Sequence, residues 1–358
     1  MKVIDLHPDP WAQLVARRDK LPHALLLSGQ HGIGKLDLAR RFAASLLCEK
    51  PTETAHACGV CLACGWLAQG NHPDFRLLQP DALGDNAGNV GDAGDGGDGS
   101  DRSDGGDAPQ RKKASQQITI GQVRAIDDFL HVGTHRHGAR IIVINPAEAM
   151  NRATANALLK SLEEPIANTL FLLVSSEVER LLPTIRSRCQ SVVLAQPARQ
   201  LAEQWLEQAG VGDAAHWLAL AGGSPLLAVK LGENEERALL HALIGELARG
   251  NALDPFAAAA VVDRVLKAEK RPAPLKRMIE WSQKWIFDLT LVSQALPVRY
   301  FIARQPELQR LAKSTDTPRV LAFNRKTLQY KAQCEQPLNS RLFLEEFFLA
   351  YAVLFRTT

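Results

Sequence analysis

The sequence predicts an α/β domain built on a parallel sheet, followed by two all-helical domains. Apolar runs typical of buried strands alternate with helical segments up to about residue 196, as in a parallel sheet. After Pro197 the strand signals stop, and helices joined by Pro- and Gly-containing turns follow. A chain of 358 residues is also too long for one ordinary domain. The predicted boundaries are 1–196 for the sheet domain, 197–250 for a small helical domain and 251–358 for a C-terminal helical domain.

The individual elements follow from periodicity. Residues 23–28 form an apolar run that ends in a glycine loop, which predicts a buried strand. Residues 35–47 repeat apolar side chains at helical spacing. Further strands are predicted at 140–144, 169–175 and 191–194, a short strand entry with a helix at 118–130, and a helix at 151–164 that Pro165 ends.

Composition excludes several classes of protein. Hydrophobic residues make up 46% and charged residues 23% of the chain, which is typical of a globular protein. No apolar run approaches the roughly 20 residues that a membrane span needs. The N-terminus has no cationic start followed by an apolar stretch, so no signal peptide is expected. We therefore expect a cytoplasmic protein without membrane contact, in which clustered cysteines are metal ligands rather than disulfides.

Charge is unevenly distributed. Residues 79–109 hold eight Asp against one basic residue, and the Gly/Asp-rich stretch at about 81–110 has almost nothing apolar. It cannot bury enough surface to offset chain entropy, so it is predicted to be a disordered insertion. Residues 264–341 carry sixteen Lys/Arg against six Asp/Glu. That charge fits either a surface for nucleic acid or an acidic partner, or simply solvated helix faces.

The glycine loop after the first strand fits the phosphate-binding motif G-x-x-x-x-G-K. The two glycines and the lysine of the motif are Gly29, Gly34 and Lys35, and Gly32 is a further glycine within the loop. Such glycines turn backbone N–H groups toward a phosphate at a helix N-terminus, and the lysine reaches the outer phosphates. The next position should be Ser or Thr to hold Mg²⁺, but it is Leu36. The alternative is a glycine-rich turn that binds nothing.

An acidic residue that ATP hydrolysis requires is also missing. Hydrolysing P-loop proteins place an Asp at the tip of a later strand to hold Mg²⁺. The matching strand ends in Asn145-Pro146, and Glu148 lies past the tip, where a first-turn helix charge is the simplest role. ATP binding is therefore possible, whereas intrinsic ATPase activity is not expected.

Four cysteines, Cys48, Cys58, Cys61 and Cys64, fall within seventeen residues. A shell of four thiolates at such spacing indicates structural zinc. An iron–sulfur cluster is the rival, although the ferredoxin-type run would need a cysteine at Ala68. His56 or His72 could replace Cys48 as a ligand, and free thiols remain the plain alternative.

Five short runs of this sequence stand out: NALLKSLEEP at 156–165, SRC at 187–189, HALLLSG at 23–29, NHPD at 71–74 and NSRLxxE at 339–345. Together they resemble motifs of the AAA+ clamp-loader proteins of bacterial DNA polymerase III. The resemblance covers most of the chain except the Gly/Asp-rich insertion.

The resemblance implies a fold and a set of roles. It implies an AAA+ P-loop domain with a zinc module at 48–64, a helical lid at 197–250 and a helical collar for oligomerisation at 251–358. In the lid motif, Leu226 stands where the family's ATPases have an arginine. Together with Leu36 and Asn145, this favours the family's non-hydrolysing subunit over the alternative, an active ATPase of the gamma/tau type. The arginine of SRC, Arg188, would then act as an arginine finger in a neighbour's ATP site, unless it only forms a surface ion pair.

The implied partners are the gamma/tau and delta subunits, with the sliding clamp and primed DNA reached through the complex. A different class, a zinc-dependent nucleic-acid binder unrelated to clamp loading, would explain the cysteines and the basic charge but not the NALLKSLEEP and SRC runs.

Overall fold

The computed structural model describes residues 3–83, 115–131, 138–233, 237–268, 274–334 and 338–355. The chain forms two compact units. The sheet unit comprises residues 3–30 and 34–195, and the helical unit comprises 31–33 and the described residues from 196 onward.

The sheet unit is built on five parallel strands in the order β2-β3-β4-β1-β5. The strands are β1 (Ala24–Ser28), β2 (Phe75–Leu78), β3 (Arg140–Ile144), β4 (Thr169–Ser175) and β5 (Gln190–Val193). Every residue of β1, β3 and β4 is buried, as expected for the centre of a sheet covered on both faces. The predicted parallel sheet is confirmed, and β2 is an additional edge strand that the sequence patterns did not indicate.

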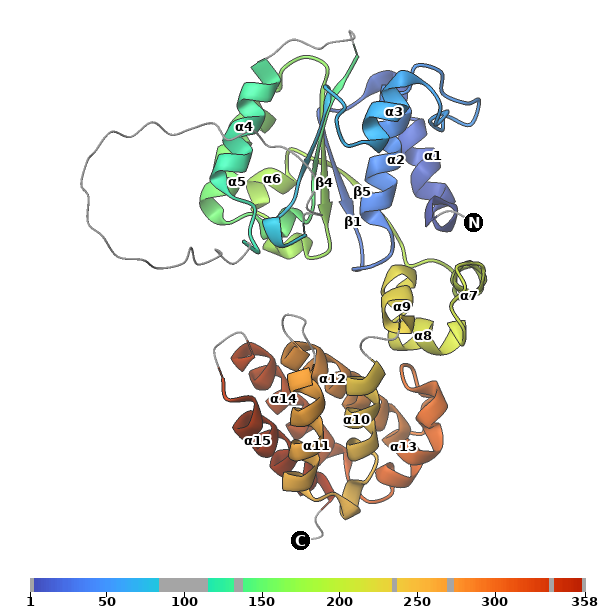
Figure 1. Ribbon diagram of the computed structural model, residues 1–358, viewed down its shortest axis with the longest axis vertical. Coiled ribbons are helices and arrows are strands. Elements are labelled where there is room, and N and C mark those ends of the chain that lie inside the picture. The colour runs from blue at the N-terminus through green and yellow to red at the C-terminus, as the bar shows by residue number, and fades with distance from the viewer. Residues whose placement is uncertain are drawn as a thin grey trace, which may run out of the picture. The chain divides into compact units, whose positions relative to one another are not determined.

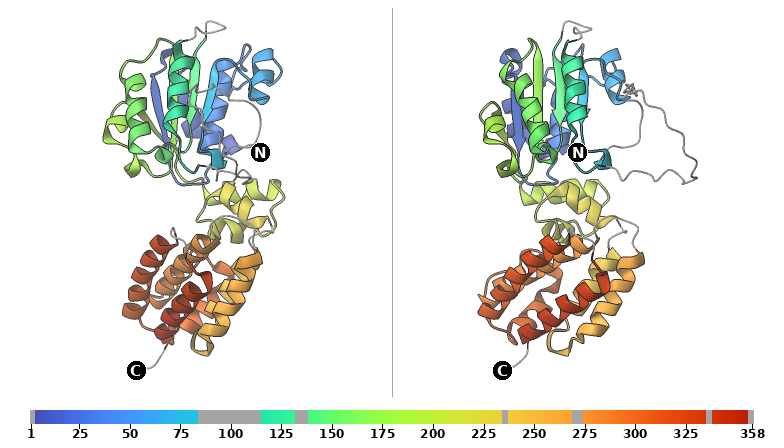
Figure 2. Two further views of the ribbon diagram at one scale, coloured as in Figure 1. Left: turned by 60° about the vertical axis from the view of Figure 1, so that its left-hand side comes forward. Right: turned by 90° about the vertical axis from the view of Figure 1, so that its left-hand side faces the viewer.

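Helices cover both faces of this sheet (Figure 1; Figure 2). The described helices of the unit are η1 (Val3–Leu6), α1 (Pro8–Val15), η2 (Arg18–Lys20), α2 (Lys35–Leu47), α3 (Leu62–Ala68), η3 (Asp81–Leu83), α4 (Ile120–His131), η4 (Ala147–Ala149), α5 (Arg152–Glu163), η5 (Val178–Arg180) and α6 (Pro183–Arg186). In Figure 1, α1, α2 and α3 lie on one side of the sheet and α4, α5 and α6 on the other. The α4/α5 side buries Ile126 and Leu158 against Phe171 of β4.

Local sequence signals determine both ends of α5. The Asn151 side chain accepts a hydrogen bond from the Thr154 N–H, an N-cap that starts α5. The helix ends at Glu163, and Pro165 lies two residues further on, where it prevents the helix from continuing. The predicted disordered insertion lies outside the described residues except for Asp81–Leu83, which form a 3₁₀ turn.

The helical unit contains α7 (Arg199–Gln208), α8 (Ala214–Leu220), α9 (Pro225–Gly232), α10 (Arg237–Leu247), η7 (Gly250–Ala252), α11 (Pro255–Ala268), α12 (Pro274–Ser293), η8 (Ile302–Arg304), α13 (Gln305–Ala312), α14 (Thr317–Gln333), α15 (Ser340–Ala352) and η9 (Val353–Phe355). Helices α7, α8 and α9 pack on one another. Helix α10, which the predicted lid range includes, packs against α11 and α12, while α15 packs on α11 and α14 on α12.

Two buried hydrogen bonds link α10, α12 and α15. The Trp285 Nε1–H of α12 donates to the Tyr351 hydroxyl of α15 over 3.1 Å. That hydroxyl donates to the Leu247 carbonyl, the last residue of α10, over 2.8 Å. Both aromatic side chains are completely buried, so the two bonds satisfy polar groups that have no access to water.

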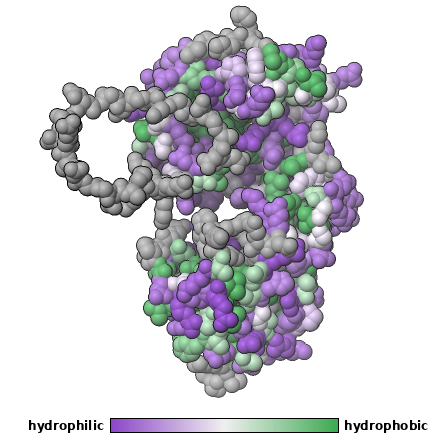
Figure 3. Space-filling view, in the orientation of Figure 1, coloured by the Kyte–Doolittle hydropathy of each residue, from purple (hydrophilic) through white to green (hydrophobic). Residues whose placement is uncertain are grey.

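The surface is mixed in character. On the face shown in Figure 3, hydrophilic residues predominate and apolar residues occur in small groups. None of the helices that the structure describes is both long enough and apolar enough to cross a lipid bilayer.

Candidate functional site

The glycine loop connects the end of β1 to the start of α2, at the carboxyl edge of the sheet. Gly29, Gly32 and Gly34 all have positive φ, at 152°, 79° and 99°. Residues with a Cβ rarely adopt the last two conformations, so glycine is required there. A side chain at Gly34 would also collide with Val3 of η1, which lies against the loop.

Lys35, the lysine of the phosphate loop, is 5% exposed and bound to groups of the chain itself. Its Nζ donates to the carbonyls of Gly29 and Gln30 over 2.8 and 2.7 Å. A third bond of 2.9 Å reaches the Ser176 hydroxyl, just after β4. Burial lowers the pKa of Lys35 to about 8, and the nearby Glu148 carboxylate opposes this effect. All three ammonium protons therefore have partners without a phosphate.

Glu148 lies closer to this loop than sequence reasoning indicated. It belongs to η4 and contributes charge to the first turn of that helix, as expected. In addition, its Oε1 accepts a hydrogen bond from the Ser176 N–H over 2.9 Å. The sequence motifs did not indicate Ser176, and for Glu148 they indicated only a helix charge, because only the tertiary fold brings η4 beside the end of β4.

The groups that would hold Mg²⁺ in a hydrolysing site are absent at the expected positions. Leu36, the residue after the loop lysine, has an apolar side chain. Asn145 at the tip of β3 carries no carboxylate, and its backbone N–H donates to the Leu78 carbonyl over 2.9 Å. This loop connects a buried strand to a helix, as the phosphate loop motif requires, but it lacks the usual metal ligands.

Residues 31–33 of the loop belong to the helical unit and contact the start of α9. The Ser224 hydroxyl donates to the His31 carbonyl over 2.7 Å. The Leu226 N–H donates to the Gly32 carbonyl over 3.0 Å. A Cβ at Gly32 would lie only 3.2 Å from the Leu227 Cβ, so glycine also allows this close approach. Leu226 contributes its backbone here and no positive charge.

Arg188 lies between α6 and β5, with about a third of its side chain exposed. One nitrogen of its guanidinium lies 2.6 Å from Glu163 Oε1 at the end of α5. The other terminal nitrogen donates to the Thr184 carbonyl over 2.9 Å. In this chain alone Arg188 therefore forms a surface ion pair, and its guanidinium has a defined orientation.

The four cysteines of residues 48–64 converge. Their Sγ atoms all lie within 4.8 Å of one another, and two of the pairs, Cys48–Cys61 and Cys58–Cys64, are 3.9 and 4.0 Å apart. A tetrahedral zinc site with Zn–S bonds of about 2.3 Å would separate its sulfurs by about 3.8 Å. The residues present therefore fit a single metal ion.

Backbone groups support this sulfur cluster. The Cys61 N–H donates to Cys58 Sγ, and the Cys64 N–H donates to Cys61 Sγ, both over 3.4 Å. Backbone N–H groups of Val60 and Cys61 lower the pKa of Cys58, whereas burial raises the pKa of Cys48 and of Cys64. The two histidines considered as substitute ligands have other roles: His56 stacks on Trp11, and His72 Nδ1 accepts from the Asp74 N–H.

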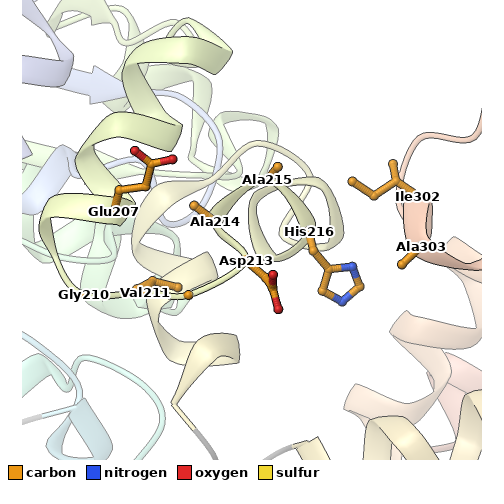
Figure 4. A pocket seen from close by; sticks show the side chains of 10 residues that line it. Glu207, Gly210, Val211, Asp213, Ala214, Ala215, His216, Ile302 and Ala303 are labelled. Atoms are coloured by element: carbon orange, nitrogen blue, oxygen red, sulfur yellow. The ribbon is translucent and has the colours of Figure 1, made fainter.

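A separate cavity of about 760 Å³ lies in the helical unit, between the turn that joins α7 to α8 and η8 (Figure 4). Asp213 and His216 line it on one side and Ile302 on the other. Burial lowers the pKa of His216, and its Nδ1 has no hydrogen-bond partner among the described residues. None of the motifs singled out in the sequence contributes to this cavity.

Comparison with known proteins identifies relatives over nearly the whole chain. A family model described as "DNA polymerase III, delta subunit" matches residues 11–198. DNA polymerase III subunit delta' of Pseudomonas aeruginosa is 32% identical over 363 aligned positions, covering 96% of this chain and 95% of that protein. The Escherichia coli subunit delta' is also 32% identical, over 58% of this chain and 54% of its own length.

Among solved structures, a gamma subunit-related protein from Thermotoga maritima covers 97% of this chain and all of its own, with a TM-score of 0.51 and 17% identity. That similarity concerns the fold. The sheet order, the glycine loop after β1 and the helical unit define a protein of the AAA+ fold class. Within this class, the chain belongs to the family of DNA polymerase III delta' subunits.

Proposed function

We propose that this chain is the non-hydrolysing stator subunit of the DNA polymerase III clamp loader and that it donates Arg188 in trans to a neighbouring ATP site. The observation that carries the first part is the state of the phosphate loop. Its lysine is saturated by Gly29, Gln30 and Ser176, and neither Leu36 nor Asn145 supplies a metal ligand. Phosphoryl transfer relies on a metal ion to neutralise the developing charge, so this site is suited at most to binding a nucleotide.

The trans role rests on the position and orientation of Arg188. Its guanidinium is partly exposed, and Glu163 and Thr184 orient it from the chain's own surface. An arginine finger can raise the rate of a neighbouring site by about 10³–10⁵, because it balances charge on the transferring phosphate. A subunit without hydrolysis of its own would in this way control the hydrolysis of a gamma/tau neighbour.

The four cysteines are proposed to hold structural Zn²⁺. Their sulfurs lie at separations that fit one tetrahedral ion, and α3 begins within the cluster, with Cys61 as its N-cap. When bound, zinc would connect the end of α2 to α3. The proposed assembly partners are gamma/tau and delta, and the sliding clamp and primed DNA are reached through the complex.

The proposal is tested in two steps. The isolated chain is expected to show no Mg²⁺-dependent ATP turnover above background. Complexes are then reconstituted with gamma and delta, carrying Arg188→Ala or the matched control Arg186→Ala. Arg186 lies two residues away and pairs with Glu179 over 3.1 Å, so the control also removes one ion-paired arginine.

The Arg188→Ala complex should assemble but hydrolyse ATP at least tenfold more slowly, well within the effect of a lost finger. The Arg186→Ala complex should resemble the wild type. Full clamp-stimulated ATPase and clamp loading by an assembled Arg188→Ala complex would show that Arg188 is not a finger. ATP turnover by the isolated chain that disappears in Lys35→Ala would contradict the non-hydrolysing assignment.

A further inference from the structure

The four clustered cysteines come from two separate parts of the chain. Cys48 directly follows α2, whereas Cys58, Cys61 and Cys64 lie just before α3 or within its first turn. Residues 49–57, here called the cysteine loop, connect the two parts. Where the parts meet, the Cys58 N–H donates to Cys48 Sγ over 3.2 Å. The position of the cysteine loop therefore determines how closely Cys58 approaches Cys48.

An aromatic contact fixes the cysteine loop to α1. The His56 imidazole stacks on the Trp11 indole, with ring centroids 4.6 Å apart and ring planes inclined by 11°. The Trp11 ring in turn lies edge-on against Phe42 of α2, which is completely buried. Helix α1 packs on α2, and both lie on the same side of the sheet as α3 (Figure 1). His56 is therefore attached to the same pair of helices that positions Cys48.

The backbone around His56 forms a tight turn. The Thr52 N–H donates to the His56 carbonyl over 2.8 Å, and the His56 N–H donates to the Thr52 hydroxyl over 3.1 Å. Ala55 has a φ of 60°, which residues with a Cβ rarely adopt and which persists where surrounding contacts hold the chain. His56 lies two residues before Cys58, so fixing its ring restricts where Cys58 can lie.

We propose that Trp11 and His56 are positioning residues of the metal site. Their stack holds the cysteine loop against α1 and keeps Cys58 beside Cys48 before a metal ion binds. A loop that is already ordered loses less conformational entropy when the ion closes the site, so the ion binds more tightly. His56 acts through its ring plane and not as a ligand, since four thiolates complete a tetrahedral shell. This inference rests on the proposed zinc site.

The test measures the zinc affinity and the zinc release rate of the full chain by competition with a chromophoric chelator. Trp11→Ala and His56→Ala each remove the stack. His56→Phe keeps a flat ring but has no nitrogen that could bind a metal. His216→Ala is the matched control, because His216 is another partly buried histidine in contact with a tryptophan, Trp217, and it lies in the helical unit.

Wild-type protein should bind one zinc ion. Each alanine variant of the stack should bind zinc about two- to tenfold more weakly and release it correspondingly faster, as expected from the loss of one aromatic pair. The double variant should be no weaker than either single variant, because both substitutions remove the same contact. His56→Phe and His216→Ala should resemble the wild type.

Three results would overturn the inference. Both alanine variants could hold zinc as tightly as the wild type, or their effects could add in the double variant. His56→Phe could also lose zinc as readily as His56→Ala, which would make the imidazole a ligand. A wild-type chain that binds no zinc would refute the zinc site itself, and the inference with it. Because His56 is partly exposed, His56→Ala keeps the test valid even if Trp11→Ala fails to fold.

Discussion

The Arg188 guanidinium lies 2.6 Å from the Glu163 carboxylate, which joins the segment before β5 to the last residue of α5. Both side chains are partly exposed, and exposed ion pairs typically contribute about 0–1 kcal/mol. Such a pair can orient Arg188 and, if the arginine acts in trans as proposed, would cost little to break. Glu163 belongs to the NALLKSLEEP run, so two of the recognised motifs meet at this contact.

The first prediction concerns this contact. Glu163→Gln should leave assembly intact and slow ATP hydrolysis by the reconstituted complex by about two- to fivefold, the range expected from losing a pair worth up to about 1 kcal/mol. Glu164→Gln is the matched control, because Glu164 is adjacent, exposed and forms no ion pair among the described residues. Steady-state ATPase assays measure the effect. A loss as large as that of Arg188→Ala would mean that Glu163 has a more direct role than orientation.

The second prediction concerns the missing metal ligands. Leu36→Thr restores the hydroxyl that normally binds Mg²⁺, yet it should not restore hydrolysis, because Asn145 still supplies no carboxylate at the tip of β3. The double variant with Asn145→Asp is the informative comparison. ATPase assays on the isolated chain decide the matter, and turnover by the single variant would show that the strand-tip acid is dispensable here.

The third prediction is that Lys35 has a structural role. Lys35→Met removes three hydrogen bonds from a buried position, which join Lys35 to Gly29, Gln30 and Ser176. The expected loss of stability at neutral pH is about 1–3 kcal/mol. Thermal unfolding of the sheet unit measures it, and an unchanged midpoint would show that the loop does not depend on its lysine.

The same residue predicts a pH dependence. The pKa of Lys35 is lowered to about 8 from an ordinary value of 10.5. Between these values the unfolded chain binds more protons than the folded chain, so Lys35 contributes a rise in stability as pH increases from about 8 to 10.5. The variant lacks this contribution. The difference in unfolding midpoint between wild type and Lys35→Met should therefore grow over this range, and a constant difference would contradict the assignment.

The fourth prediction concerns the metal. Purified protein should contain one zinc per chain, and Cys61→Ser should lose it and loosen the segment around α3, since structural zinc contributes on the order of 10 kcal/mol of apparent binding free energy. Cys334→Ser makes the same chemical change outside the cluster and should retain zinc. Elemental analysis and hydrogen exchange of residues 48–68 provide the measurements. Iron with visible-range absorption in place of zinc would overturn the assignment.

Sequence patterns revealed some parts of this molecule and not others, for physical reasons. The central strands β1, β3 and β4 were predictable because burial on both faces demands unbroken apolar runs. Strand β2 was not, because a four-residue edge strand with an exposed Arg76 resembles a loop. The cysteine cluster was predictable because its four cysteines lie close together in the sequence. By contrast, the bond from Lys35 to Ser176 joins residues 141 positions apart, which no local pattern encodes.

The hydrogen bonds of the Tyr351 hydroxyl have a consequence for how the protein is made. They join α10, the first helix of the C-terminal bundle, to α15, which ends within the last residues of the described chain. The ribosome delivers α10 long before α15, and domains generally fold in the order in which they emerge. The sheet unit can therefore fold before the bundle is complete, because the partner of the buried Trp285 N–H is supplied only when Tyr351 has been synthesised. Completion of the bundle, and of any assembly that depends on it, therefore follows the synthesis of α15.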